Sequence, residues 1–273
     1  MLKTNAKLMI SLAYHTVEQV MRGLGRLIGR IPPGRCIVLY YHSVPAGSRA
    51  SFSRQMDQVL ELATPIDAGF SGELEPGRTY VSITFDDALH SVRDEAFPEL
   101  KARKIPFAIF VPSALLGVNP TWPMAPDCPD AQELILTAEE LRELPEDLVT
   151  LGSHTRTHPR MTDLDQSAAR EELAGSRSEL EAALDRKIDL FAFPYGAYDA
   201  NLLKLCREVG YRRVFLVEPG ATQLNQADYA IRRVAVDPDD SPLRFRLKVL
   251  GAYSWMPTVS ALKRTLLGRK QSA

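Results

Sequence analysis

The sequence predicts an α/β fold built around a parallel sheet. Between residues 36 and 217, short apolar runs typical of strands alternate with segments of helical character, which is the pattern of successive β-α units. The composition agrees, because 45% of the 273 residues are hydrophobic and 25% are charged, as in a globular protein with a large core. With only 16 Gly and 19 Pro and no internal repeat, collagen-like, mucin-like and coiled-coil proteins are excluded.

Six apolar runs are expected to form the strands of this sheet. In chain order they are Cys36–Tyr41, Thr79–Phe85, Phe107–Val111, Leu148–Leu151, Asp189–Phe193 and Val214–Val217. The connection at residues 112–136 contains five prolines and is too irregular for a core element. It is also too long for a simple link, so we expect it to overhang a functional site.

Three segments between these runs carry the signals of helices. Thr137-Ala-Glu-Glu140 has the form of a capping box, in which Thr and a Glu three residues later satisfy the free N–H groups at a helix start. Residues Ser167–Asp185 are rich in Ala, Leu, Glu and Arg. The segment Asn201–Val209 stops at Gly210, a residue that commonly ends helices.

Charge divides the chain into three parts. Residues 1–35 have a net charge of +5 and residues 241–273 of +7, so the whole-chain charge of −1 leaves −13 for residues 36–240. We therefore expect a basic N-terminal helix, a barrel-like body over residues 36–240 and a basic C-terminal extension. An acidic body argues against a nucleic-acid-binding domain, whereas the basic ends make an anionic membrane surface a candidate partner.

The N-terminal helix is expected to be amphipathic. Its apolar residues recur at helical spacing: Met9, Leu12, Val20, Leu24, Leu27 and Ile31. Charged residues step by four along another face: Glu18, Arg22, Arg26 and Arg30. Two interpretations stay open, a helix that lies in a membrane interface and a helix packed against the open side of the barrel.

Targeting signals are weak in this sequence. No apolar run reaches the ~20 residues that a membrane-spanning helix needs. Charged and polar residues interrupt residues 1–31, and no cleavage site of small residues follows. Cys36, Cys128 and Cys206 lack metal-type spacing and are expected to be free thiols in a reduced compartment. We therefore expect a cytoplasmic protein, with peripheral contact to the membrane as the alternative above.

Residue types that commonly act in catalysis or bind metals stand at the ends of four of the predicted strands. They are Tyr41-His42, Asp86-Asp87, His154-Thr-Arg-Thr-His158 and Pro194-Tyr195-Gly196. In β/α barrels the active site is built from the carboxyl ends of the strands, so we expect these residues to converge. If residues 154–158 make a helical turn, both imidazoles point to one side and can share a metal ion. One carboxylate of the Asp pair would complete the ligand set, and the other would act as a base on a metal-bound water.

These motifs resemble the polysaccharide deacetylases of carbohydrate esterase family four, whose conserved unit is the NodB-homology domain. The matching segments are Thr84-Phe-Asp-Asp87, Ser153-His-Thr-Arg-Thr-His158 and Phe191-Ala-Phe-Pro-Tyr-Gly196, within a resemblance that covers roughly Cys36 to Val217. The resemblance implies a distorted, incomplete (β/α) barrel that binds a divalent metal, usually zinc. It assigns Asp87, His154 and His158 as metal ligands, Asp86 as general base, and the backbone N–H of Tyr195 as a donor to the oxyanion.

The sequence departs from the family pattern at several positions. Ala88 stands where the first motif usually has Gly, and Ala192 stands where the third motif usually has the Arg that holds the catalytic Asp. Arg232 or Arg233 is a candidate replacement. No His follows His158, so the customary general acid is missing. The apolar strand that ends in His42 has the form of the missing motif. Because a barrel closes on itself, we expect His42 to supply this acid from the first strand.

Two other residues have weaker signals. His90 is expected to be a surface residue or to support the site from outside the ligand set, and Trp122 either stacks on a sugar ring or packs within its loop.

The predicted activity is removal of N-acetyl groups from the amino sugars of a glycan or glycan precursor, by attack of a metal-bound water. A cytoplasmic location would suit a lipid-linked or nucleotide-linked precursor of an exported polysaccharide. Two alternatives remain: a metal-dependent hydrolase of a non-sugar C–N bond, and a catalytically silent relative that binds glycan or docks on a membrane complex.

Overall fold

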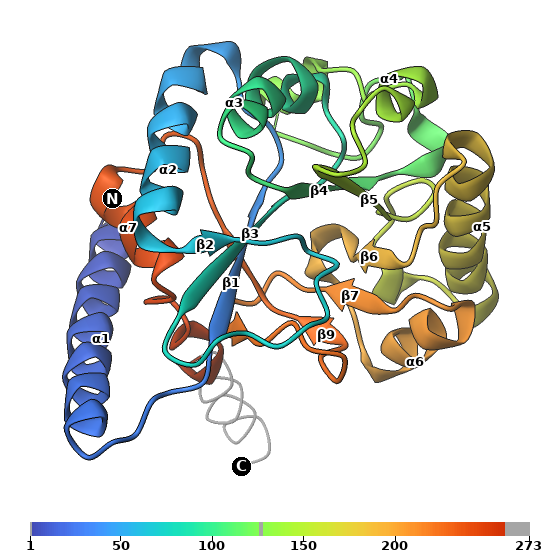
Figure 1. Cartoon of the computed structure of the whole chain (residues 1–273). Helices are drawn as coiled ribbons and strands as arrows, with labels where there is room; N and C mark the ends of the chain where they lie inside the picture. Colours follow the sequence, from blue (N-terminus) through green and yellow to red (C-terminus); the bar gives the residue numbers. More distant parts are fainter. Residues whose placement is uncertain (1, 126–127, 260–273) are drawn as a thin grey trace.

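A single, mostly parallel sheet forms the centre of the computed structural model, which describes residues 2–125 and 128–259 (Figure 1). Its main strands are, in spatial order, β10 (Arg233–Ala235), β1 (Arg35–Tyr41), β3 (Thr79–Phe85), β4 (Phe107–Val111), β5 (Val149–Ser153), β6 (Leu190–Ala192), β7 (Arg213–Phe215) and β9 (Ala230–Ile231). Two short strands lie off this path: β2 (Thr64–Pro65) pairs with β3, and β8 (Ala221–Thr222) pairs antiparallel with β1.

The sheet curls into a nearly closed barrel, as the sequence predicts. Its two edge strands, β9 and β10, are consecutive in the chain and are separated only by Arg232. The chain itself therefore bridges the seam of the barrel. The first strand, β1, pairs in parallel with both β3 and the last strand, β10, with Val38 opposite Arg233.

Helices surround the barrel (Figure 1). They are α1 (Leu2–Leu27), α2 (Arg49–Leu62), α3 (Phe97–Ala102), α4 (Ala138–Arg142), α5 (Gln166–Leu184), α6 (Ala200–Val209) and α7 (Pro242–Val249). Short helical turns occupy Ala46–Ser48, Val92–Ala96, Ser113–Leu115, Pro129–Gln132, Met161–Asp163 and Pro194–Gly196. Among the described residues, no helix is both long and apolar enough to cross a membrane.

The helix boundaries follow from local hydrogen bonding. At the start of α4, Thr137 Oγ1 accepts from the N–H of Glu140 at 3.2 Å and the Glu140 carboxylate accepts from the N–H of Thr137 at 2.9 Å, which confirms the capping box. Helix α5 begins at Gln166 because Asp165 caps it, and it ends before Asp185, which has a left-handed φ of 52°. Gly210 ends α6 with a φ of 97°.

Side chains alternate between two apolar cores along the strands. Cys36 and Val38 of β1 point into the barrel, where they meet residues such as Phe110 and Phe215, whereas Ile37 points out toward the helices. The larger core fills the layer between barrel and helices. It includes Phe245 and Val249 of α7, so the C-terminal extension expected from residue 241 onward begins with a helix that belongs to the barrel's cover. Residues 260–273 of that extension lie outside the described part.

One end of the barrel is closed by a buried cation. Arg213, the first residue of β7, is 1% exposed and donates to the backbone carbonyls of Ala68 at 2.8 Å, Phe70 at 2.7 Å and Leu224 at 3.1 Å. These carbonyls belong to two loops at the amino ends of the strands. Arg213 therefore ties the floor of the barrel together, at the end opposite to the strand termini that carry the catalytic residue types.

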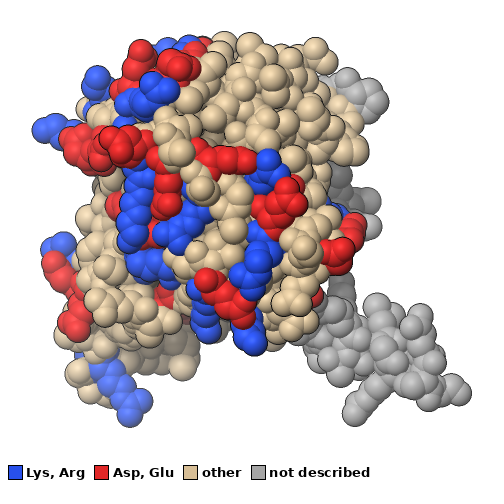
Figure 2. All heavy atoms as spheres, turned by 90° about the vertical axis from the view of Figure 1, so that its right-hand side faces the viewer, with Lys and Arg blue, Asp and Glu red and all other residues tan. Residues whose placement is uncertain are grey.

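The surface over α5 and α6 carries both signs of charge. Figure 2 shows Lys and Arg side chains interspersed with Asp and Glu on this face. Several of them pair, for example Arg170 with Glu208 at 2.5 Å and Arg177 with Glu181 at 3.2 Å. Exposed pairs of this kind contribute little to stability, and the mixture of signs gives this face no uniform field.

Candidate metal centre and catalytic cleft

One cleft of about 360 Å³ lies at the carboxyl ends of β1, β3, β5 and β6. It contains all six residues for which the sequence predicts a catalytic or metal-binding role: His42, Asp86, Asp87, His154, His158 and Tyr195. The fold explains this convergence, because parallel strands of one barrel bring their carboxyl ends to the same face.

Three of these residues form a cluster that could hold a metal ion. Asp87 Oδ1 lies 3.5 Å from His154 Nε2 and 3.3 Å from His158 Nε2, and the three candidate ligand atoms all lie within 4.8 Å of one another. All three side chains are buried. Two imidazole nitrogens and one carboxylate oxygen are ligands that suit a divalent transition metal with open positions.

The protonation of His154 fits the role of a metal ligand. Its Nδ1 lies 2.8 Å from the carbonyl oxygen of Ala192. Because a carbonyl only accepts, the ring proton resides on Nδ1, and Nε2 offers its lone pair to the cluster. Burial, only partly offset by Asp86, lowers the pKa of His154 to about 4, which keeps the ring neutral. Asp87 Oδ1 is buried without a hydrogen-bond partner among the described residues, which also fits a cation at this place.

The loop that carries the two histidines is not the helical turn considered from the sequence. Residues 154–160 are irregular, and both Thr155 and His158 have left-handed φ values, 69° and 59°. Thr155 stabilises the loop because its Oγ1 accepts from the N–H of His158 at 3.0 Å. The two imidazoles therefore converge through this strained loop, with ring centroids 5.0 Å apart, rather than through i, i+4 spacing on a helix.

The turn after β3 also uses the left-handed region. Asp87 has a φ of 70° and Ala88 a φ of 54°. This conformation explains why glycine is the usual residue at the position of Ala88 in the motif that the sequence resembles, since glycine adopts it without a steric penalty. Here Ala88 takes the same conformation and is fully buried.

Asp86 has surroundings quite different from those of Asp87. Both of its carboxylate oxygens accept from one guanidinium group, with Arg233 Nη1 at 2.6 Å and Nη2 at 2.9 Å. Burial raises the pKa of Asp86, but Arg233 and His154 outweigh this effect and lower it to about 2. Asp86 is therefore a carboxylate at neutral pH, held in one orientation by a bidentate pair.

Arg233 fills the place of the Arg that the third motif lacks. The residue is fully buried inside the barrel, where its Nε donates to the carbonyl of Leu216 at 3.1 Å and its guanidinium lies 4.6 Å from the ring centroid of Tyr40. Arg232, the other candidate from the sequence, points to solvent. Ala192 contributes its backbone carbonyl to His154 instead of a side chain to Asp86.

Aromatic rings fix the orientation of His158. Trp122 stacks on it with ring centroids 3.8 Å apart, and Tyr195 meets it edge-on at 4.8 Å. Trp122 comes from the proline-rich connection, which overhangs the site as the sequence predicts. One face of Trp122 is thus used in packing against a candidate ligand. Tyr195 has a left-handed φ of 57° and is 44% exposed in the cleft, with Arg160 5.2 Å from its ring centroid.

The remaining histidines differ in position. His42 follows β1, is exposed, and lines the cleft with its ring 5.7 Å from that of Tyr40. His90 lies outside the cleft, with its Nε2 3.2 Å from a carboxylate oxygen of Glu140.

Part of the cleft's rim could not be predicted from the sequence. Met124, Cys128 and Asp130 line the cleft, and the Ser43 hydroxyl donates to Asp130 Oδ1 at 2.6 Å, which ties this rim to the loop after β1. The proline-rich composition predicts that the connection covers a site, but it does not indicate which of its side chains face the cleft.

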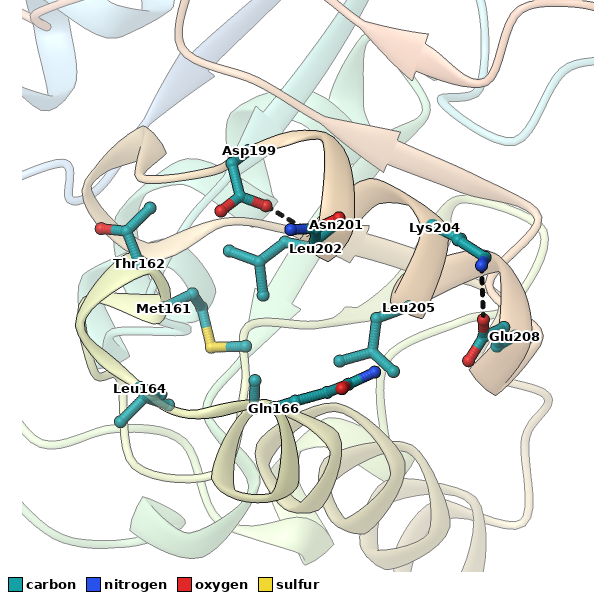
Figure 3. A pocket seen from close by; sticks show the side chains of 11 residues that line it. Met161, Thr162, Leu164, Gln166, Asp199, Asn201, Leu202, Lys204, Leu205 and Glu208 are labelled. Carbon is teal, nitrogen blue, oxygen red and sulfur yellow. Dashed lines mark hydrogen bonds and ion pairs between the residues drawn. The ribbon is translucent and has the colours of Figure 1, made fainter.

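A second hollow lies between α5 and α6 (Figure 3). Its polar side chains have local roles: Asp199 caps α6 by accepting from the N–H of Leu202 at 2.8 Å, and Lys204 lies 3.9 Å from Glu208. The cluster of buried ionisable groups described above belongs to the other cleft, which is therefore the stronger candidate for catalysis.

Comparison with known proteins links this cleft to one family. The family model for polysaccharide deacetylases matches residues 73–214. The Bacillus subtilis (strain 168) protein that carries the name "Putative polysaccharide deacetylase YxkH" is 26% identical over 232 residues, 81% of this chain and 76% of that protein. The structure of IcaB from Ammonifex degensii is similar with a TM-score of 0.65 and 25% identity, covering 81% of this chain and 98% of IcaB.

A further structure shares the fold at lower sequence identity. The Streptococcus pyogenes deacetylase PplD, solved in complex with acetate, aligns with a TM-score of 0.64 and 18% identity over 81% of this chain and 99% of PplD.

Proposed function

Because this chain belongs to the polysaccharide deacetylase family, we propose that it is a metal-dependent hydrolase that removes N-acetyl groups from the amino sugars of a glycan or glycan precursor. The observation that carries the proposal is the placement of Asp87, His154 and His158 around one point, directly beside the Arg-held carboxylate of Asp86. The acetate in the PplD structure is the kind of product that this reaction releases.

Asp87 Oδ1 and the Nε2 atoms of His154 and His158 would hold the divalent ion, for which Zn²⁺ is the main candidate given two nitrogen donors and one oxygen donor. Such an ion, when bound, lowers the pKa of a water molecule and polarises a carbonyl group. The hydrogen bond from His154 Nδ1 to the Ala192 carbonyl would fix the direction of the first imidazole, and Trp122 and Tyr195 would fix the second.

Asp86 would take the proton of the attacking water. It is ionised at neutral pH, and Arg233 prevents its carboxylate from turning away or binding the ion itself. The backbone N–H of Tyr195 would donate to the oxygen of the tetrahedral intermediate. His42, on the same cleft, would protonate the departing amine of the sugar.

The interpretation as a catalytically silent relative rested on the missing third-motif Arg and on the missing late motifs. Arg233 removes the first of these reasons, because it supplies the same charge to the same carboxylate from another strand. The deacetylase activity is therefore the function that the geometry supports best.

The test measures the metal content of the protein and the acetate that it releases from an acetylated sugar. The full chain, stripped with a chelator and reloaded with Zn²⁺ or Co²⁺, should release acetate from an N-acetylglucosamine oligomer only when the metal is present. His154→Ala should lose tight metal binding, because it removes one of three ligands. His90→Ala is the matched control and should keep both metal and activity, since His90 lies outside the cleft.

Two outcomes would each contradict a different part of the proposal, the metal ligands or the substrate. Equal metal content in His154→Ala and in the unmodified chain would show that the ligand assignment is wrong. A metal-loaded chain that releases no acetate from acetylated sugars, but cleaves a non-sugar amide, would keep the metal site and reject the glycan substrate.

A further inference from the structure

Helix α1 contacts the rest of the protein mainly through polar side chains, apart from Leu8, which packs against a small apolar cluster. Ser11 Oγ accepts from the indole N–H of Trp255 at 3.0 Å. Glu18 pairs with Arg22 of the same helix and with Arg35 at the start of β1, and Arg35 in turn donates to the carbonyl of Leu250 at 3.0 Å. The face of α1 that is turned toward the body is therefore mostly polar.

The opposite face of α1 is apolar and exposed. Exposure reaches 63% at Val17, 57% at Val20, 54% at Leu24 and 83% at Leu27. The full set, which we call the apolar stripe, is Met9, Ile10, Leu12, Tyr14, Val17, Val20, Met21, Leu24, Leu27 and, just after the helix, Ile28 and Ile31. At about 100° per residue these side chains fall on one continuous arc. In a typical surface helix the apolar side faces the protein, whereas in α1 the apolar side faces solvent.

The charge around the stripe is positive. Glu18 is the only acidic residue in residues 1–35, and it faces the body, where it is paired with two arginines. Lys7, Arg26 and Arg30 are exposed. By helical spacing, Lys7 and Arg26 lie on opposite borders of the stripe. An anionic membrane surface can interact with both features. It buries apolar side chains among its lipids, and its negatively charged headgroups attract the basic residues at the borders of the stripe.

We propose that α1 binds the protein to the surface of an anionic membrane, with the apolar stripe in the interface between headgroups and acyl chains. The helix stands at the outside of the molecule beside α7, so the stripe is accessible (Figure 1). A second copy of the chain is a poorer occupant. A twofold contact would set each basic border near its own counterpart, and the outward face of α1 offers no acid to neutralise it.

The experiment is co-sedimentation of the full chain with vesicles, and two adjacent substitutions test the stripe. Binding should occur to phosphatidylcholine vesicles that contain phosphatidylglycerol, and should fall at high salt and with phosphatidylcholine alone. Val20→Glu places a carboxylate within the stripe and should weaken binding at least about tenfold, because this charge must enter the apolar interface. Gln19→Glu adds the same charge at an exposed residue off the stripe and should weaken binding by about threefold at most.

Both substituted positions are exposed, so thermal unfolding should be unchanged in either variant. No binding to anionic vesicles at low salt would overturn the proposal. Equal weakening by the two substitutions would overturn it as well, because binding would then depend on charge alone. A dimer in analytical ultracentrifugation that Val20→Glu dissociates, without any vesicle binding, would assign the stripe to a second copy instead. None of these results depends on the catalytic activity.

Discussion

Two adjacent carboxylates, Asp86 and Asp87, face different partners because the backbone changes direction between them. Asp86 continues the strand direction, and its N–H donates to the carbonyl of Tyr41 at 2.9 Å. Asp87 turns into the left-handed region, which aims its side chain at the two histidines. The sequence predicts that the two acids differ in role, because neighbours on an extended chain point in opposite directions. It does not by itself predict which of them faces the metal ligands.

Replacement of Asp86 by Asn should separate metal binding from catalysis. The amide keeps the size of the side chain but cannot accept a proton, so turnover should fall by roughly 10²- to 10⁴-fold, the range typical for loss of a general base. Metal content should be unchanged, because Asp86 is held by Arg233 rather than by the ligand cluster. Acetate release and metal analysis on the same preparation check this. Full activity in the metal-loaded variant would mean that another group is the base.

His42→Ala tests the source of the proton for the leaving amine. His42 is exposed on the cleft and is not a member of the buried ligand cluster, so the variant should fold and bind metal normally. Activity should fall by roughly 10²-fold or more, and the pH profile of kcat/KM should lose its basic limb, which reports deprotonation of the general acid. A variant with an unchanged pH profile would exclude His42 from this role.

The histidine pair shows what the separation of two residues in the sequence can and cannot predict. The residues His154 and His158 are brought together as expected, but by a loop with left-handed Thr155 and not by a helical turn. Spacing in sequence constrains which residues are near one another. The backbone path depends on contacts such as the hydrogen bond from the His158 N–H to Thr155 Oγ1, which no local pattern specifies.

Among the elements, each of the six predicted apolar runs matches a strand, and the strands that were not predicted have only two or three residues. The predicted strand Phe107–Val111 agrees with β4 at both ends, and Thr79–Phe85 agrees with β3, because an apolar run buried on both faces has a clear pattern. The predicted run Leu148–Leu151 is displaced, since β5 continues through Gly152 and Ser153, which pair with β4. The unpredicted strands β2, β8, β9 and β10 carry too few residues for any periodicity, whereas the three-residue strands β6 and β7 overlap longer apolar runs.

In the proposed mechanism, strand β10 contributes one residue, Arg233, and the neighbouring Arg232 gives a matched test. Arg233→Gln should leave the buried charge of Asp86 without its partner, so its pKa should rise. The acidic limb of the pH profile should then move to higher pH, because the base is lost by protonation at a higher pH than before. The protein should also lose about 3 kcal/mol of unfolding free energy, as expected when one member of a buried pair is removed.

Arg232→Gln is the control for that measurement. Arg232 is exposed, so its replacement should shift neither the pH profile nor the midpoint of urea unfolding. Arg233→Lys should give an intermediate result, since it keeps the charge but loses the two-pronged contact. Equal pH profiles for Arg233→Gln and the unmodified chain would show that Arg233 has no part in holding the base.

The whole molecule is a barrel with the candidate site at one end and a buried structural arginine at the other. Arg213 holds loop carbonyls at the floor, while Arg233 holds Asp86 near the cleft. Among the described residues, the hydrogen-bond acceptors of Arg213 are backbone carbonyls, and Asp228 and Asp67 interact with its charge without accepting a hydrogen bond from it. From the sequence, a buried arginine at the start of a strand has no distinguishing signal, because the carbonyls come from loops distant in the chain.

Arg213→Met should destabilise the fold without affecting the catalytic groups directly. The apolar side chain fills similar space but leaves several buried carbonyls without donors, which should cost at least about 3 kcal/mol. The neighbouring Arg212→Met should cost less than about 1 kcal/mol, because Arg212 makes exposed ion pairs with Asp189. Urea unfolding of the two variants provides the comparison. Similar losses of unfolding free energy in both would show that Arg213 does not hold the loops at the amino ends of the strands together.

The seam between β9 and β10 has a consequence for how a working molecule is made. During translation, the strands from β1 to β7 leave the ribosome before residues 230–235, so a nascent barrel already has its three candidate ligands while one side of β1 is still open. At that stage Asp86 lacks the counter-charge of Arg233. In the proposed mechanism, a chain cut short by a nonsense codon or a protease before this segment would have no oriented base. In that mechanism the last strand of the barrel completes the site, and a chain that ends before residue 230 should be inactive.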